Sequence, residues 1–112
     1  MKKIEAIIRV SKFEDIKEAL ESIGVNFFTY LEVSGHGKQK GETVTYRGAV
    51  YDSGDIPRLL IELVVTDDRV DEIIKTIIGH GQTDHIGDGK IIVTPVERFI
   101  RIRTGEIDQE AL

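Results

Sequence analysis

The feature that most constrains the fold is an order of secondary-structure signals that occurs twice in 112 residues. In the first half, residues 2–10 alternate apolar and polar side chains, as a half-buried strand does. Residues 13–23 place apolar side chains at helical spacing, and residues 25–33 are rich in aromatic and β-branched side chains typical of strands. The first half therefore predicts a strand, a helix and a strand.

The second half repeats this order. Residues 58–65 alternate as a strand, residues 70–78 carry an apolar helical stripe, and residues 90–96 form the last predicted strand. Two such halves predict an α+β fold, the ferredoxin-like βαββαβ sandwich, in which two helices cover one face of a four-stranded antiparallel sheet. We expect residues 1–112 to form this single domain.

Local signals predict where the helices begin and end. Ser11 and Glu14 have the spacing of a capping box, and Thr66 precedes two acidic residues as a helix cap would. Gly24 is expected to stop the first helix, because glycine readily adopts the left-handed conformation found at helix ends.

Three stretches break the regular pattern. Residues 36–56 are glycine-rich and polar and predict a long loop between the second and third strands, and loops of this length are usually functional. A second glycine-rich loop is predicted at about residues 79–90. A C-terminal loop is predicted at about residues 101–112, starting within an extended segment at 99–103, and its last residues, 104–112, are expected to be mobile.

Composition excludes several classes of protein. The net charge of −5 argues against a nucleic-acid binder, and the absence of cysteine excludes disulfides and thiolate metal sites. No apolar run approaches membrane-spanning length, so we expect a cytoplasmic protein that meets a membrane only through a partner. No nucleophile motif is present, and His80 and His85 fit no standard zinc spacing. We therefore expect no enzyme, with a small nucleotide hydrolase as the weaker alternative.

The positive charges gather in three places that suit a phosphate-bearing ligand. They are the glycine-lysine stretch at residues 35–41, the sequence Gly-Asp-Gly-Lys at 87–90, and the Arg-Ile-Arg sequence at 101–103. Glycine lets a backbone approach phosphate closely, and lysine and arginine supply charge and hydrogen-bond donors. Alternation would put Arg101 and Arg103 on one side of an extended segment. Each stretch alone also fits a flexible loop, a simple turn or ordinary surface arginines.

One sheet face is predicted to carry a mixture of apolar and charged side chains. Because the helices cover only the other face, this mixture favours burial against another subunit, and we expect a homo-oligomer. The residues assigned to this face are Ile7, Leu60, Val64 and Ile92, beside Glu5, Arg9 and Glu62.

The chain resembles the PII nitrogen-regulatory signal-transduction family over essentially its whole length. The matching strings are KKIEAIIR at 2–9, GKQKG at 37–41, YRGA at 46–49, IGDGKI at 86–91 and IRIRTGE at 100–106. The resemblance implies a homotrimer in which ATP and ADP compete for clefts between subunits. The phosphates would meet Lys38, Gly87, Gly89 and Lys90 of one subunit and Arg101 and Arg103 of its neighbour, with Thr29, Glu62 and Val64 on the adenine side. Ile7, Gly35, Gly37, Gln39 and Asp88 complete the implied nucleotide site.

The resemblance also implies a second ligand and a moving loop. In the family, 2-oxoglutarate binds through Mg²⁺ and ATP, with Gln39 as the implied metal ligand. The residues implied for the oxoacid are Gln39, Lys40, Gly41, Arg58 and Gly87. The long loop, called the T-loop in the family, would engage an ammonium transporter or another transporter or enzyme through Arg47. Tyr51 matches a position modified by a uridylyltransferase in many members.

Two departures from the family pattern bear on these implications. Arg58 stands where a lysine usually pairs with 2-oxoglutarate, and arginine and lysine are not equivalent there. Phe27 and Phe28 replace a smaller, less aromatic pair near the adenine end. The alternative function is therefore a sensor of adenine nucleotides that does not respond to 2-oxoglutarate and regulates a different target.

Overall fold

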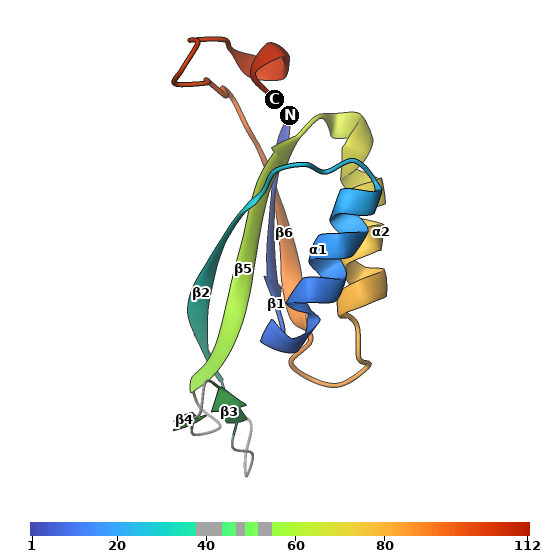
Figure 1. The fold of residues 1–112 in the computed structure, drawn as a ribbon, viewed down its shortest axis with the longest axis vertical. Coiled ribbons are helices and arrows are strands. Elements are labelled where there is room, and N and C mark those ends of the chain that lie inside the picture. The colour runs from blue at the N-terminus through green and yellow to red at the C-terminus, as the bar shows by residue number, and fades with distance from the viewer. Residues whose placement is uncertain (38–43, 47–48, 52–54) are drawn as a thin grey trace.

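The computed structural model describes residues 1–37, 44–46, 49–51 and 55–112. Its main elements form two β-α-β units joined by the segment between β2 and β5 (Figure 1). The main strands and helices, in chain order, are β1 (Lys2–Ile8), α1 (Phe13–Ser22), β2 (Thr29–His36), β5 (Asp55–Val65), α2 (Val70–Gly81) and β6 (Gly89–Pro95).

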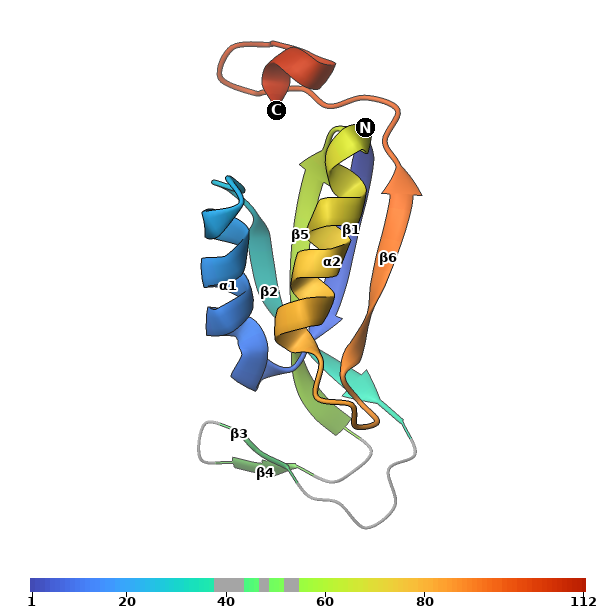
Figure 2. The ribbon, with the colours of Figure 1, turned by 90° about the vertical axis from the view of Figure 1, so that its right-hand side faces the viewer.

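The sheet has four strands in the order β2-β5-β1-β6, and every neighbouring pair is antiparallel. Both helices lie on the same face of the sheet, with α1 and α2 side by side (Figure 2). This arrangement confirms the predicted α+β ferredoxin-like sandwich.

The core lies between the helices and the covered face of the sheet. Alternate residues of β1, namely Ile4, Ala6 and Ile8, are buried there, as their spacing predicts. Removing each large apolar side chain from water contributes about 1.5–3 kcal/mol to stability. The other strands and helices bury a matching set: Phe13, Ile16, Leu20, Val25, Leu59, Ile61, Leu63, Ile73 and Ile77.

The second strand starts later and runs further than predicted. Its first residue is Thr29 rather than Val25, because Val25 lies in the turn that follows α1, where its N–H bonds back to Leu20 O at 3.0 Å. Gly24 has φ +84 and stops α1 as expected. The strand continues to His36, three residues beyond its predicted end at residue 33.

The third long strand also exceeds its prediction and begins at Asp55, before Pro57. Proline has no backbone N–H, so it costs a ladder hydrogen bond only at a position where a neighbouring strand would otherwise accept that N–H. Pro57 pairs with Ser34 on one side, whereas β1 joins β5 only from Leu59 onward, so the other side of Pro57 has no β1 partner.

The interval predicted as irregular loop contains two short strands. These are β3 (Val44–Tyr46) and β4 (Ala49–Tyr51), which pair antiparallel as a separate two-stranded sheet. Three-residue strands give too short a sequence pattern to be recognised among polar residues.

The predicted cap at Ser11 is wrong, and the predicted cap at Thr66 is confirmed in position only. Each helix is preceded by a 3-10 turn, Val10–Lys12 before α1 and Asp67–Arg69 before α2. Ser11 lies inside the first turn, where no side-chain cap is made, and Thr66 occupies the cap position of the second turn without a side-chain hydrogen bond. The 3-10 turns satisfy the exposed N–H groups by other means.

The C-terminal segment also differs from its prediction. Ile100 forms a single bridge with Ile107, and residues 102–104 form a turn, closed by a 2.8 Å bond from Gly105 N to Arg101 O. Gly105 has φ +72, which this turn requires. The tail then folds into a 3-10 helix, Asp108–Ala111, with Ala111 buried, rather than forming a loose end.

Candidate functional site

The segment between α2 and β6 forms a short loop at one end of the sheet. Helix α2 includes Gly79 and Gly81, so this loop covers residues 82–88 rather than the predicted 79–90. Gly87 and Gly89 have φ of +98 and +111, which side-chain-bearing residues rarely adopt. A Cβ on Gly89 would lie 1.8 Å from Ile7 O, so only glycine lets the loop join β6 here.

Asp88 holds the 82–88 loop in shape. Its carboxylate accepts hydrogen bonds from Thr83 N at 2.7 Å, from the Thr83 hydroxyl, and from Asp84 N at 3.0 Å. Arg9 Nε donates to the same carboxylate at 2.9 Å. The hydrogen bonds from Thr83, then that from Arg9, hold the pKa of Asp88 well below its usual range, so the group is a carboxylate at neutral pH.

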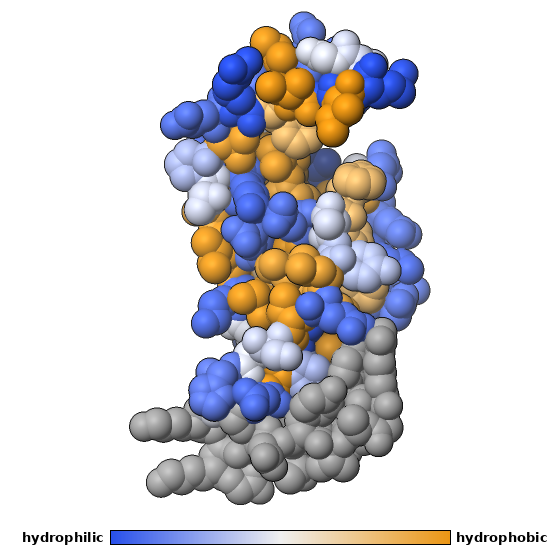
Figure 3. Space-filling model, turned by 90° about the vertical axis from the view of Figure 1, so that its left-hand side faces the viewer, coloured by the Kyte–Doolittle hydropathy of each residue, from blue (hydrophilic) through white to orange (hydrophobic). Residues whose placement is uncertain are grey.

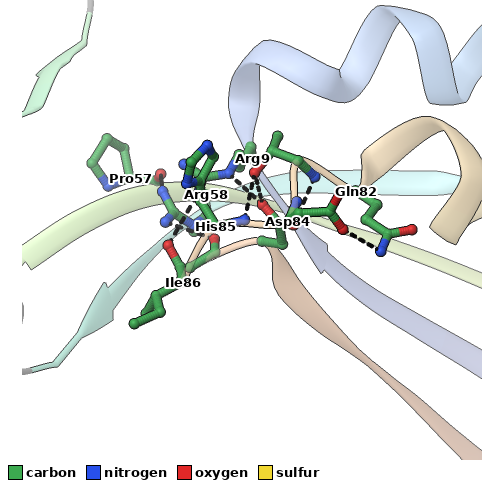
Figure 4. Close-up of polar contacts among 10 residues, drawn as sticks. Arg9, Pro57, Arg58, Gln82, Asp84, His85 and Ile86 are labelled. Carbon is green, nitrogen blue, oxygen red and sulfur yellow. Dashed lines mark hydrogen bonds and ion pairs between the residues drawn. The ribbon is translucent and has the colours of Figure 1, made fainter.

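Two arginines bind the loop from the sheet (Figure 4). Arg9 Nη2 donates to Ile86 O at 3.0 Å, and Arg58 Nη2 donates to Gly87 O at 3.0 Å. The other terminal nitrogen of Arg58 donates to Pro57 O, also at 3.0 Å. Burial and the nearby charge of Arg9 lower the pKa of Arg58, and the Asp88 carboxylate partly offsets this. The loop is thus tied both to the end of β1 and to β5.

The sheet register brings further predicted residues to this end. Lys90 lies opposite Ile7 in the β1–β6 ladder, and Gly35 lies opposite Ile56 in β5. A cleft of about 530 Å³ between α2 and β6 is lined by Ile7, Asp88, Gly89 and Lys90 together with apolar side chains of α2 and β6. Arg9, Arg58 and Lys90 give this end three cations beside the Asp88 carboxylate, which suits an anion.

A second set of predicted residues lines a larger cleft, of about 700 Å³, which we call the C-terminal cleft. Thr29 and Glu62 face each other across the β2–β5 ladder, and Val64 follows on β5. Arg101 contributes from the C-terminal segment. The remaining lining residues were not predicted as site residues: Gly24, Val25, Asn26, Phe27, Leu63, Val65, Thr66, Arg69, Phe99, Ala111 and Leu112.

Arg101 is held in place by its own chain. One terminal nitrogen lies 3.3 Å from Glu106 Oε1, and the other donates to Ala111 O at 3.0 Å. Arg103 is exposed in the adjacent turn. The prediction that both guanidinium groups lie along one side of an extended segment is therefore wrong, because the turn at 102–104 redirects the chain.

The two sets lie at opposite ends of the sheet (Figure 1). The 82–88 loop precedes β6, whereas Arg101 follows its other end. Seven residues of strand extend over roughly 20 Å, which is longer than the phosphate chain of a nucleotide. Within one chain, therefore, Lys90 and Arg101 do not meet.

Several predicted residues lie outside the described part of the chain. These include Lys38, Gln39, Lys40, Gly41 and Arg47, so the predicted metal ligand, Gln39, is not described. Tyr51 is described only as part of β4. In the described ranges, no three His, Cys, Asp or Glu side chains gather as a metal site would require. Of the helices in the described residues, none is long and apolar enough to span a membrane.

The histidines divide between three settings. His80 lies within α2, not in a loop, and its Nδ1 is 2.9 Å from Thr76 O. His85 is exposed in the 82–88 loop. His36 ends β2, and its Nδ1 lies 2.9 Å from Asp55 Oδ1 at the last pair of the β2–β5 ladder.

Comparison with known proteins gives consistent matches along the chain. The family model for nitrogen regulatory protein P-II matches residues 1–106. A nitrogen regulatory protein P-II of Klebsiella oxytoca is 54% identical over 112 residues, and nitrogen regulatory protein P-II 1 of Escherichia coli K12 is 53% identical. The P-II protein of Cereibacter sphaeroides is 49% identical. Each match covers 100% of both chains.

Proposed function

Because this chain belongs to the nitrogen regulatory protein P-II family, we propose that it is a homotrimeric sensor of ATP and ADP that regulates a nitrogen-metabolism target through the segment between β2 and β5. Nitrogen-regulatory signal transduction, rather than catalysis, is the role that family membership supports. The finer assignments, namely the ligands, the trimer and a target such as an ammonium transporter, are parts of the proposal.

The observation that carries the proposal is the separation of the two predicted half-sites. Lys90 and the 82–88 loop lie at one end of β6, and Arg101 with the C-terminal cleft lies at the other. Neither cleft alone brings Lys90 and Arg101 together, because each cleft is lined by only one of them. A nucleotide held by both must lie between two copies, with one end of each, and a closed ring of copies repeats this contact at every interface.

The uncovered face of the sheet supports assembly. Leu31, Leu60 and Ile7 form one continuous cross-strand row on the face opposite the helices, and their side chains are exposed or half-buried. Lys3 lies 3.6 Å from Glu5 and 3.5 Å from Glu62 beside this row. Figure 3 shows this face, with apolar patches divided by polar side chains. A second copy would remove these patches from water.

Coupling between ligand and target has a direct route in the chain. Arg58 joins Gly87 O of the 82–88 loop to β5 close to the point where β5 emerges from the T-loop. A ligand that binds differently to two arrangements of the 82–88 loop would therefore bias the start of β5 as well. Through this link the T-loop would present Arg47 and Tyr51 to a partner or to a uridylyltransferase.

The proposal predicts that a lysine and an arginine far apart in the chain serve one ligand. Lys90→Ala and Arg103→Ala should each weaken ATP and ADP binding by about 10- to 100-fold, because each removes a charge-assisted contact to phosphate. Isothermal titration calorimetry measures both affinities. Lys75→Ala, on α2 and outside both clefts, is the matched control. Unchanged binding in both variants would refute the site, and steady phosphate release by wild type would favour the hydrolase alternative.

Mixing the two variants tests whether the site lies between copies. In a ring, a copy with Arg103→Ala still offers Lys90, and its neighbour with Lys90→Ala still offers Arg103. Co-refolding equal amounts should restore about one quarter of the wild-type number of tight sites, by random assembly of trimers. A site within one chain would restore none.

One observation favours the adenylate-only sensor as a second candidate. Both terminal nitrogens of Arg58 already donate to backbone carbonyls of Pro57 and Gly87. These bonds use two of the five N–H donors of the guanidinium and fix its orientation. An oxoacid that needs another orientation would have to break them, which offsets part of its binding energy.

Calorimetry distinguishes this candidate from the first by whether 2-oxoglutarate binds. With Mg-ATP saturating, 2-oxoglutarate should give little or no binding heat with wild type and measurable binding with Arg58→Lys, whose ammonium group cannot bridge two carbonyls in the same forked geometry. Tight, ATP-dependent oxoacid binding by the wild type would reject this second candidate and retain the first.

A further inference from the structure

An exposed aromatic side chain lies at the C-terminal cleft without a role in the site described so far. Phe27 is 82% exposed, although large aromatic side chains usually contribute most when buried. Its backbone position is nevertheless fixed from both sides. Val25 is buried in the core, and the Phe28 ring packs edge-on against Phe13 at a centroid distance of 6.3 Å.

The two neighbouring phenylalanines therefore have different tasks. Phe28 also contacts Tyr30, with ring centroids 6.3 Å apart, and anchors the segment between α1 and β2. Phe27 turns away from this cluster and lines the C-terminal cleft. Anchoring its neighbours fixes the backbone from which the Phe27 side chain extends, so that little backbone entropy is lost when a ligand covers the ring.

The rest of the cleft indicates what kind of ligand fits. Its strand wall offers the apolar side chain of Val64 beyond the polar groups of Thr29 and Glu62, which lie opposite each other in the β2–β5 ladder. Arg101 places a cation at the same cleft. A flat aromatic group with a hydrogen-bonding edge and attached negative charge matches this combination, and the cleft volume lies within the range of small-molecule sites.

We propose that Phe27 stacks on the base of the bound nucleotide and is an affinity determinant of this chain's nucleotide site. The inference rests on the proposed function and deepens it, because it assigns the base to the Phe27 wall of the C-terminal cleft. Stacking uses the face of the base and not its edge, so Phe27 raises affinity without choosing between bases. It also acts far from the terminal phosphate, so ATP and ADP gain equally.

The test uses three substitutions at this one position in the full chain. Phe27→Ala should weaken ATP and ADP binding by the same factor, about 5- to 50-fold, since both nucleotides lose one base-stacking contact. Phe27→Leu keeps a large apolar side chain without a π face and should lose a comparable part of the affinity. Phe27→Tyr keeps the ring and should bind within about twofold of wild type.

The proton NMR chemical shifts of bound adenine would not change if Phe27 had only a structural role. The H2 and H8 protons of bound adenine should shift upfield in wild type and in Phe27→Tyr, because a stacked ring shields them, and the shift should vanish in Phe27→Leu. Light scattering on each variant checks that assembly is unchanged.

The outcomes distinguish this inference from the proposed function. If wild type binds no adenine nucleotide, the proposed function fails. If wild type binds but all three variants bind equally well, or if Phe27→Ala changes the assembly state, the stacking assignment alone is overturned. A larger loss for ATP than for ADP would also overturn it, because it would place Phe27 near the phosphates.

Discussion

The two ends of the sheet are built in opposite ways. At the 82–88 loop, Asp88 accepts hydrogen bonds from Thr83, Asp84 and Arg9, and two arginines take backbone carbonyls of the loop. At the C-terminal cleft, Arg69 and Arg101 each donate to a backbone carbonyl, and an exposed Phe27 stands beside a folded tail. One end holds charges in fixed places, whereas the other lines a cleft with an exposed aromatic ring beside apolar and polar side chains. A nucleotide has the same division, with charged phosphates and a flat base.

The largest expected effect breaks the rigid end at Gly89. Gly89→Ala adds a Cβ that would lie 1.8 Å from Ile7 O at φ +111, so either β1 or the loop must move. We expect a loss of about 2–4 kcal/mol in the free energy of unfolding, from strain and displaced packing. Urea denaturation followed by circular dichroism measures this loss.

Gly79→Ala is the matched control for that substitution. An added Cβ at Gly79 meets no atom within 4 Å among the described residues, and Gly79 lies inside α2. Alanine is favoured over glycine in a helix by about 1 kcal/mol, so this variant should be as stable as wild type or more stable. If the two glycine variants behave alike, the tight approach of Gly89 to β1 is wrong.

A smaller effect sharpens the electrostatic side of the comparison. The pKa of Asp88 is lowered in the folded chain, so its contribution to stability is present above the ordinary carboxyl pKa of about 4 and is lost as pH falls below that value. In Asp88→Asn this part of the acid dependence should disappear. Thermal unfolding between about pH 3 and pH 7 should show a shallower decline in the variant. An identical pH profile for both proteins would show that the carboxylate does not hold the loop.

The smallest expected effect is at the C-terminal cleft. Glu106→Gln removes the 3.3 Å ion pair with Arg101, but both side chains are more than one-third exposed. Pairs of this kind contribute at most about 1 kcal/mol, so we expect a change below about 0.5 kcal/mol in unfolding free energy. Denaturation under the conditions used for Gly89→Ala gives a direct comparison. A loss as large as that of Gly89→Ala would contradict the contrast between the ends.

The periodicity of apolar residues predicts the strands and helices that extend over many residues. Strand alternation and helical spacing identified four strands and two helices, because each buries one face and each is long enough to show its period. Short-range signals were less informative. The Ser11 and Glu14 spacing matches a capping box, yet a 3-10 turn precedes α1 and Ser11 lies inside that turn.

The site depended on contacts that no local pattern contains. Arg9 and Asp88 are 79 residues apart, and neither position predicts the other. The sequence distinguishes Phe27 only as a departure from the family pattern, since an exposed ring and a buried one look the same in a sequence. The reversal at residues 102–104 was missed because Arg-Ile-Arg alternates as a strand would, while Gly105 closes the turn.

His36 and Asp55 form the last pair of the β2–β5 ladder, and this pairing affects how the sequences of such proteins can diverge. The ladder itself holds the two ends of the intervening segment side by side, so the cost of closing that segment depends only weakly on its length and little on its sequence. Substitutions there can accumulate without loosening the sheet or the clefts. Changes confined to the segment between β2 and β5 can thus produce binding to new partners, while the sheet and the two clefts stay the same.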